Sequence, residues 1–365
     1  MTLWLYHHRL TRLAIIALFH TLPFFAHAQT APDHILLKDH KPQSIYKIPE
    51  TRPEKARFPA IDVHSHDYAR TEADVERWAR TMDSVGLEKT IIMSGATGAK
   101  LDALLAKYGK RPDRFTVWCG IDYTDMDQPG FGPAAVAELE RCKKAGATGV
   151  GELSDKGRGL GATTNRLGMH VDDPRMDSIL EKCADLRMPV NIYVAEDKWM
   201  YEPMDAANDG LMNAWTWRVT NAPGILQHDE VIDTLGRAVK KHPRTTFIAC
   251  HLANCCSDLT RLGAMLDKYS NLNADIGARY SELSPIPRFV SAFFTRYPGR
   301  ILYGTDMTPD AGMYRETFRI LETADDHFYL THFRNYHWPL YGLDLPEPLL
   351  KNIYRENALR IALPN

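Results

Sequence analysis

The sequence predicts one closed (β/α)8 barrel, a TIM barrel of the α/β class. Eight short apolar runs rich in β-branched residues alternate with helical segments, and this rhythm is typical of a barrel. The runs are almost continuously apolar, as parallel strands covered on both faces must be. The expected strands span residues 58–65, 88–94, 115–121, 147–153, 188–195, 245–251, 271–278 and 300–305. An open doubly wound sheet would instead need a glycine-rich phosphate turn after the first strand, where this chain has His64-Ser65-His66-Asp67.

The N-terminal segment has the features of a secretory signal peptide. Two arginines precede an apolar run over 13–25, and residues 26–28 fit the small-x-small cleavage rule. Residues 1–28 are therefore expected to be removed during export to the periplasm or the medium, leaving Gln29 as the mature start. An uncleaved anchor is the alternative. Pro23 interrupts the run, which is short for a span of roughly 20 residues, so no stable membrane anchor is expected.

The overall composition limits the class of partner. The formal net charge is −2 and charged residues make up 25% of the chain. Such a chain has no strong field to attract nucleic acid or an anionic membrane, so a small-molecule substrate is the expected partner. Assembly into a homo-oligomer remains open.

Residues 29–57 carry prolines and charges without periodicity, which predicts an extended arm ahead of the barrel domain at 58–365. The six cysteines do not have the spacing of a small disulfide framework. Cys119 and Cys250 fall in expected strands and should be buried. An oxidising compartment would permit a bridge involving Cys255 or Cys256, but the sequence does not choose one.

Local signals place the helices between the strands. Residues 72–85 carry one apolar stripe, with Thr71 positioned to cap the helix. A second helix over 133–146 should stop at Gly146. Residues 196–228 interrupt the rhythm, are rich in Trp, Tyr and Met, and are expected to form an active-site lid.

Metal-ligand side chains end four of the expected strands. His64 and His66 share one face of strand one, because alternate residues of a strand point the same way. Glu152 ends strand four, His251 strand six and Asp306 strand eight. Each alone is often structural. The C-terminal ends of barrel strands meet at one rim, however, and burying such a cluster without a cation would be costly. The pattern predicts a divalent metal site.

These residues also carry a family resemblance. The run at 62–66, Asp-Val-His-Ser-His, resembles the first-strand signature of the amidohydrolase superfamily. Within it, the chain is similar to the amidohydrolase-related (amidohydrolase 2) group, which includes enzymes like aminocarboxymuconate-semialdehyde decarboxylase. The resemblance extends from about Phe58 to the C-terminus. It implies a metal-dependent (β/α)8 barrel.

The resemblance assigns roles to individual residues. His64 and His66 match the first-strand ligands, and His251 matches the strand-six histidine. Asp306 matches the strand-eight aspartate, which in such enzymes binds metal and accepts a proton from the attacking water. A bound ion would bring the pKa of that water down towards roughly 7. The expected cofactor is one or two divalent ions, Zn first and Mn second.

One position departs from the family pattern. Tyr193 stands at the end of strand five, where the family usually has histidine. Glu152 is expected to replace that ligand, although an ion pair beneath the site, or a site that has lost its metal, would also explain the change. The Tyr193 hydroxyl is then expected to face the substrate or the metal-bound water, and not the ion.

Two further residues are candidates for substrate contact. Arg279 follows strand seven and is expected to hold an anionic group, unless it is a surface arginine. Trp199, in the aromatic lid, suggests a flat or apolar substrate, unless it serves only lid packing.

The sequence therefore predicts an exported metal-dependent hydrolase that cleaves an amide, ester or lactone. Asp306 would act as the general base, and His251 would bind the ion or stabilise the oxyanion. The alternative enzyme is a metal-dependent decarboxylase acting on a small carboxylic acid. A third alternative is an exported binding protein that kept the barrel without catalysis.

Overall fold

The computed structural model describes residues 31–330, 332 and 336–364. The expected signal peptide, residues 1–28, lies outside the described residues. Residues 31–40 belong to a small unit separate from the rest, in which Pro32–His34 and Leu37–Asp39 are short 3-10 helices. Within the described part of the chain, no helix combines the length and the apolar character needed to cross a bilayer.

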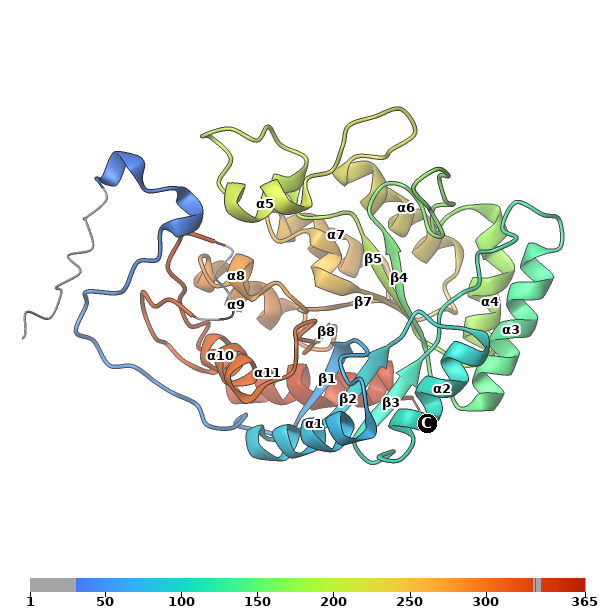
Figure 1. The fold of residues 1–365 in the computed structure, drawn as a ribbon, viewed down its shortest axis with the longest axis horizontal. Helices are drawn as coiled ribbons and strands as arrows, with labels where there is room; N and C mark the ends of the chain where they lie inside the picture. Colours follow the sequence, from blue (N-terminus) through green and yellow to red (C-terminus); the bar gives the residue numbers. More distant parts are fainter. Residues whose placement is uncertain (1–30, 331, 333–335, 365) are drawn as a thin grey trace, which may run out of the picture. The chain divides into compact units, whose positions relative to one another are not determined.

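Eight parallel strands, in a three-stranded and a five-stranded sheet, curve into a barrel (Figure 1). They run in chain order: β1 Ala60–Ser65, β2 Leu87–Met93, β3 Phe115–Trp118, β4 Val150–Asp155, β5 Val190–Val194, β6 Phe247–Ala249, β7 Leu272–Asp275 and β8 Ile301–Leu302. A parallel bridge between Cys119 and Val150 joins β3 to β4. The amide of Val63 donates to the carbonyl of Tyr303 at 3.0 Å and joins β1 to the end of β8. The predicted (β/α)8 barrel is confirmed.

The helices lie outside the strands (Figure 1). They are α1 Glu72–Val85, α2 Gly98–Tyr108, α3 Phe131–Ala145, α4 Asp177–Asp185, α5 Leu211–Trp217, α6 His228–Lys241, α7 Leu259–Lys268, α8 Tyr280–Leu283, α9 Pro287–Arg296, α10 Ala311–Glu322 and α11 Glu347–Lys351. Shorter 3-10 turns span Pro174–Met176 and Lys198–Met200, and π-helical turns span Asn352–Glu356 and Ala358–Ala362. Cys250–Asn254 is a tight turn in which residues 251–254 have left-handed backbone.

The ends of α1 follow from local sequence signals. The Thr71 hydroxyl accepts from the amide of Asp74, and the Asp74 carboxylate accepts from the amide of Thr71 at 2.8 Å. This reciprocal capping box satisfies two amides that the first helical turn leaves free. Gly86, with φ of +81°, ends the helix in the left-handed conformation that glycine adopts without strain. The predicted helix over 72–85 and its cap are confirmed.

Two apolar clusters fill the barrel unit. The larger packs the outer faces of the strands against the helices. The smaller joins side chains from strands on opposite sides of the barrel, so it fills the interior; it contains Ile61, Val63, Ile91, Met93, Trp118, Ile248 and Leu302, with Ala358, Ile361 and Ala362 from the C-terminal segment. All six cysteines are buried and free, so no bridge forms at Cys255 or Cys256.

Residues 41–59, which precede the barrel, form no helix or strand but are hydrogen-bonded to it. Thr51 donates through its amide and its hydroxyl to the Asp325 carboxylate, both at 2.8 Å. The expected lid, residues 196–228, contains the Lys198–Met200 turn and α5, so it is partly helical.

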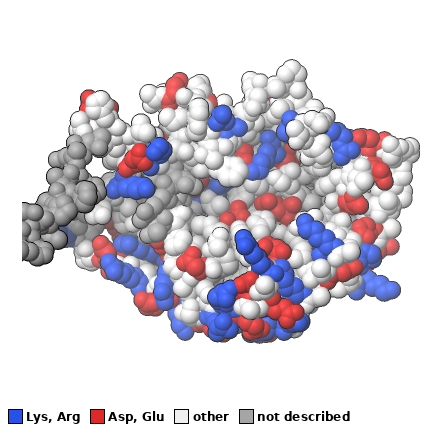
Figure 2. Space-filling view, viewed as in Figure 1, with Lys and Arg blue, Asp and Glu red and all other residues white. Residues whose placement is uncertain are grey.

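Figure 2 shows acidic and basic side chains interspersed over one face, without a large area of one sign of charge.

Candidate metal centre and active site

The ligand-type side chains predicted from the sequence meet at the C-terminal rim of the barrel. The Nε2 atom of His64 is 3.3 Å from Oε1 of Glu152 and 3.8 Å from Oδ1 of Asp306. The ligand atoms fall into two groups that share His64, with all atoms of a group within 4.8 Å of one another. The groups are His64, His66 and Asp306, and His64, Glu152, Cys250 and His251. The structure thus brings the predicted ligands together, although His66 and Glu152 fall in different groups.

Local backbone geometry aims these side chains inward. The register between β1 and β2 shifts between Asp62 and Ser65, next to His64. His251 and Asp306 have left-handed backbone, with φ of +59° and +52°. This conformation costs non-glycine residues about 1–2 kcal/mol each, so the surrounding packing must impose it. It turns the chain sharply after β6 and β8 and brings both side chains to the rim.

Asp275, at the end of β7, orients the first histidine and was missed by the sequence analysis. Its carboxylate accepts from Nδ1 of His64 at 3.1 Å, from Asn191 at 2.9 Å and from the amide of Gly277 at 2.9 Å. With its Nδ1 proton held there, His64 presents a bare Nε2 to the centre. The sequence analysis missed Asp275 because it extended strand seven to residue 278, which placed this residue in the middle of the expected strand and not at its end.

The residues fit a divalent cation. The His251 Nδ1 donates to the carbonyl of Gly277 at 2.6 Å, so its Nε2 is also bare. The Nε2 atoms of His64 and His251 are buried and have no hydrogen-bond partner within the described part of the chain, which is costly unless a cation lies between them. Burial raises the pKa of Glu152, yet the neighbouring His251 and His64 rings hold that pKa well below the ordinary value. Burial also raises the pKa of Asp306, but the neighbouring His64 and His66 outweigh this effect and lower that pKa to about 2.

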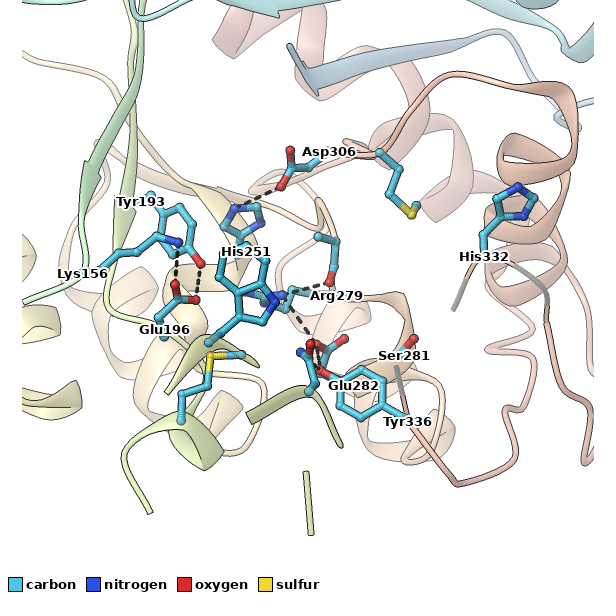
Figure 3. Close-up of a pocket in the computed structure, with 15 residues that line it drawn as sticks. Lys156, Tyr193, Glu196, His251, Arg279, Ser281, Glu282, Asp306, His332 and Tyr336 are labelled. Atoms are coloured by element: carbon cyan, nitrogen blue, oxygen red, sulfur yellow. Dashed lines mark hydrogen bonds and ion pairs between the residues drawn. The ribbon is translucent and has the colours of Figure 1, made fainter. Parts of the chain in front are cut away.

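A cavity of about 320 Å³ opens beside this cluster (Figure 3). Its lining includes His251 and Asp306, together with Lys156, Tyr193, Glu196, Met200, Asn213, Trp217, Ala278, Arg279, Ser281, Glu282, Met307, His332 and Tyr336. The sequence analysis missed Lys156, Glu196, Glu282 and Tyr336. Only Lys156 and Glu196 carried a usable signal, since each lies just beyond the end of a strand.

Tyr193 lines the cavity, and its hydroxyl is hydrogen-bonded to a carboxylate that lines the same cavity. It donates to the Glu196 carboxylate, which also pairs with Nζ of Lys156 at 2.5 Å. The ring of Tyr193 meets that of His251 edge-on, with centroids 4.5 Å apart, and the Lys156 ammonium stands 4.5 Å from the Tyr193 ring centre. A buried carboxylate three residues further along the chain takes the hydroxyl, because it is the nearest strong acceptor.

Arg279 lines the cavity, but its charge is already balanced. Its Nη1 lies 3.5 Å from Glu282 (Figure 3). The same atom lies 3.4 Å from Asp197, and Nε of Arg279 donates to Asn254 at 3.0 Å. Arg279 therefore has little uncompensated positive charge with which to bind the expected anionic group of a substrate.

Trp199 does not line the cavity. Its ring packs against Tyr336 and Trp338, with centroids 6.3 and 5.9 Å away. Met200 and Trp217 line the cavity from the same segment. The substrate contact expected of Trp199 therefore has no support, because aromatic packing holds its ring away from the lining.

The buried Asp197 carboxyl makes stability depend on pH. Burial raises its pKa to about 7, although Arg279 opposes the shift. Unfolded Asp releases its proton near 3.9, so between these values the folded state holds more protons and the free energy of unfolding falls as pH rises. We expect it to fall by about 2 kcal/mol from about pH 5 to about pH 8, and Asp197→Asn to remove most of that fall. Urea unfolding at several pH values measures both, and equal slopes in the two proteins would contradict the prediction.

Comparisons with known proteins agree with the geometry. The amidohydrolase family model (amidohydrolase-2 group) matches residues 14–361. No curated protein matches the chain. A solved 2,6-dihydroxybenzoate decarboxylase from Rhizobium is similar, with 15% identity, a TM-score of 0.52, and 84% of this chain and 99% of that chain covered.

Two further solved structures share the fold. A 5-carboxyvanillate decarboxylase from Novosphingobium aromaticivorans, complexed with manganese and 4-hydroxy-3-methoxy-5-nitrobenzoic acid, has 15% identity and a TM-score of 0.52, with coverage of 87% and 100%. A dihydroxybenzoic acid decarboxylase from Polaromonas, with manganese and 2-nitroresorcinol, has 14% identity and a TM-score of 0.51, with coverage of 84% and 97%. With the family matched across nearly the whole chain and a metal-ligand cluster at the barrel rim, this protein belongs to the amidohydrolase family, in its amidohydrolase-2 group, and is a metal-dependent enzyme.

Proposed function

We propose that the protein is a metal-dependent decarboxylase that releases carbon dioxide from a small, single-ring carboxylic acid. The observation that carries the proposal is the cavity beside His251 and Asp306. Its volume of about 320 Å³ lies at the low end for ligand pockets, and Tyr193, Trp217 and Tyr336 supply aromatic surface. This space suits one ring with small substituents better than an acyl group together with its leaving group.

The charge of the lining favours loss of a carboxylate. Glu196, Glu282 and Asp306 line the cavity, against Lys156 and Arg279. Lys156 and Arg279 are already paired with Glu196 and Glu282, so beyond the ion the lining offers little free positive charge to hold a substrate carboxylate, and none is needed once the group leaves as neutral carbon dioxide. Hydrolysis of an ester or amide would instead create a new carboxylate in the same space.

The chain's own residues can supply the proton that the reaction consumes. When the carbon–carbon bond breaks, its electron pair stays on the ring carbon, which then takes up one proton. Asp306 lines the cavity, and its Oδ1 lies 3.0 Å from Nε2 of His66. Burial works against a charged His66, but the hydrogen bond to Asp306 raises its pKa, so this pair retains a proton beside the cavity. We assign storage of the proton to His66 and its transfer to the ring carbon to the Asp306 carboxylate, which stays ionised until it receives that proton.

The ion would be held by His64 together with one of two neighbouring sets. One set is Glu152 and His251, and the other is His66 and Asp306. A divalent ion supplies Lewis-acid polarisation of a substrate oxygen. His64 is oriented by Asp275, and His251 by the carbonyl of Gly277, so both rings are fixed before substrate arrives. Two of the decarboxylase structures that share this fold contain bound manganese, which supports a divalent ion here as well.

Hydrolysis is the second candidate, and one observation favours it. Asp306 is held ionised, with its pKa lowered to about 2 by His64 and His66 against the effect of burial. An ionised carboxylate beside a metal centre can accept a proton from an attacking water. A lactone or small aryl ester would fit the same cavity.

A substrate screen decides between the two reactions. Purified protein is incubated with hydroxylated benzoic acids and, separately, with aryl esters, amides and lactones, and both carbon dioxide and hydrolysis products are measured. We expect carbon dioxide from at least one acid, loss of that activity after chelation, and its return when a divalent metal is added back. Ester or lactone cleavage without any carbon dioxide release would overturn the proposal in favour of a hydrolase.

A further inference from the structure

We propose that Tyr336 is a positioning residue of the active site, whose hydroxyl joins the lid helix α5 to α8 and so holds the cavity closed around the substrate. The inference rests on the proposed function only in taking this cavity as the substrate site, and it holds for a decarboxylase and for a hydrolase. It predicts that loss of the hydroxyl loosens α5 and weakens substrate binding without slowing the chemical step.

The hydroxyl of Tyr336 is bonded to two other walls of the cavity. It accepts a hydrogen bond from Nδ2 of Asn213, in α5, at 2.7 Å. It donates to Oε1 of Glu282, in α8, at 2.6 Å (Figure 3). All three side chains line the cavity, and a bond to a carboxylate is stronger than one between neutral groups. We call these three side chains the lid contact, because they join parts of the chain that are distant in sequence.

Residues 336–341, which carry the hydroxyl, are fixed on α8. The indole Nε1 of Trp338 donates to the carbonyl of Ser281 at 3.0 Å. The Ser284 hydroxyl donates to the carbonyl of Tyr341 and accepts from the amide of the same residue, both at 2.6 Å. These three bonds do not involve α5. They give the lid contact a firm base on the side of α8, so its strength decides how well α5 is held.

The helix α5 has little packing of its own. It is seven residues long, which is too short for a stable helix in water. Ala214 is its buried residue, while Trp215 and Trp217 are 58% and 52% exposed. In the part of the chain that the structure describes, the bond from Asn213 is the hydrogen bond that joins α5 to a residue outside the lid segment, 196–228. A segment with so few buried contacts opens readily when such a bond is lost.

Glu282 extends the lid contact to the turn that carries His251. Its Oε1 lies 3.5 Å from Nη1 of Arg279, and Nε of Arg279 donates to Oδ1 of Asn254 at 3.0 Å. Asn254 ends the Cys250–Asn254 turn, whose left-handed backbone must be imposed by its surroundings. Arg279 supplies one of these contacts. Its buried guanidinium is thereby explained as a link between the lid contact and the turn, and not as a substrate ligand.

Hydrogen exchange tests the lid contact without any substrate. Tyr336→Phe removes the hydroxyl and keeps the ring that packs against Trp199 and Trp338. Amide exchange is measured on the metal-loaded wild type and variant, and we expect α5 to exchange at least about tenfold faster in Tyr336→Phe, because two hydrogen bonds are lost. Tyr341→Phe is the matched control. Tyr341 lies on the same segment and bonds Ser284 through its backbone, so its variant should exchange as the wild type does.

Steady-state kinetics on the substrate found in the screen gives a second readout. We expect Tyr336→Phe to raise KM by about tenfold and to leave kcat within about threefold of the wild type, because the lost bonds hold the lid and do not touch the reacting atoms. Asn213→Ala breaks the lid contact from the side of α5 and should produce the same pair of changes. Should Tyr336→Phe fail to fold, Asn213→Ala carries both measurements.

Three results would overturn the inference. One is unchanged exchange of α5 in Tyr336→Phe, and another is equal acceleration in Tyr341→Phe, which would make the segment and not the hydroxyl responsible. The third is a fall in kcat at constant KM, which would place Tyr336 in the chemical step. Exchange needs no turnover, so a failed search for carbon dioxide release leaves the lid contact tested on its own.

Discussion

Replacing Asp306 with Asn is expected to lower turnover by about 100- to 10,000-fold while leaving the fold intact. Asp306 lines the cavity, and it is the carboxylate that pairs with Nε2 of His66. An amide of the same shape can neither accept nor deliver a proton at that place, so the loss should fall on the chemical step and not on substrate affinity. Steady-state kinetics on the substrate found in the screen measures kcat and KM separately, and circular dichroism reports the fold.

The control and the metal content make this test sharper. Asp326→Asn removes an exposed carboxylate away from the cavity lining and should leave turnover unchanged. Elemental analysis of Asp306→Asn measures its metal content and separates a ligand role of Asp306 from its role in proton transfer. Wild-type kcat in Asp306→Asn would contradict the prediction, and a loss of turnover with unchanged metal content would assign Asp306 to proton transfer alone.

Replacing Asp275 with Asn is expected to weaken metal binding by about 10- to 100-fold. The carboxylate accepts from Nδ1 of His64 and from the side-chain amide of Asn191. An amide in its place turns its own N–H groups towards one of these donors, and His64 can then move its proton from Nδ1 to Nε2. A protonated Nε2 cannot bind a cation, so the ion loses the ligand that both groups share. Titration of the metal-free protein with zinc, followed by calorimetry, measures the change.

Asp155→Asn is a closely matched control for this variant. Asp155 also ends a strand, is fully buried, and bonds a histidine, His170, through Nδ1 at 2.7 Å. It also accepts from the amides of Gly157 and Gly159, so its loss should destabilise the barrel in the same way. His170 is outside both ligand groups, and zinc affinity should be retained. Equal losses of affinity in the two variants would show that Asp275 acts only through stability.

Much of the fold could be predicted from the sequence, because its causes are local. The strand positions follow from short apolar runs, and the limits of α1 follow from Thr71, Asp74 and Gly86, which lie within or beside the helix itself. The rim site follows from one further rule, that parallel barrel strands all end on the same side. That rule brought His64, Glu152 and Asp306 together before their distances were known.

The same rule could not say which strand-end residues share an ion. That choice depends on the rotation of each strand about its own axis and on the turns that follow it. After β6 and β8 the chain turns because His251 and Asp306 themselves have left-handed backbone. The sequence does not predict this conformation, since neither position is glycine. Cys250 was predicted only as a buried small residue, because its distance to Glu152 is set by the packing of β6 against β4 across the barrel.

The amino-acid sequence alone therefore determined the barrel, the capped helices and the rim where the chemistry lies, because these depend on periodicity and on neighbours in the chain. Only the tertiary structure decided which charges remain free at that rim. Arg279 is balanced by Asp197 from the segment after β5, and the Tyr193 hydroxyl is taken by Glu196. The Arg279–Asp197 pair joins two segments that lie far apart in the sequence. A buried charge is balanced by whichever opposite charge the packing brings within reach, and a linear pattern does not contain that distance.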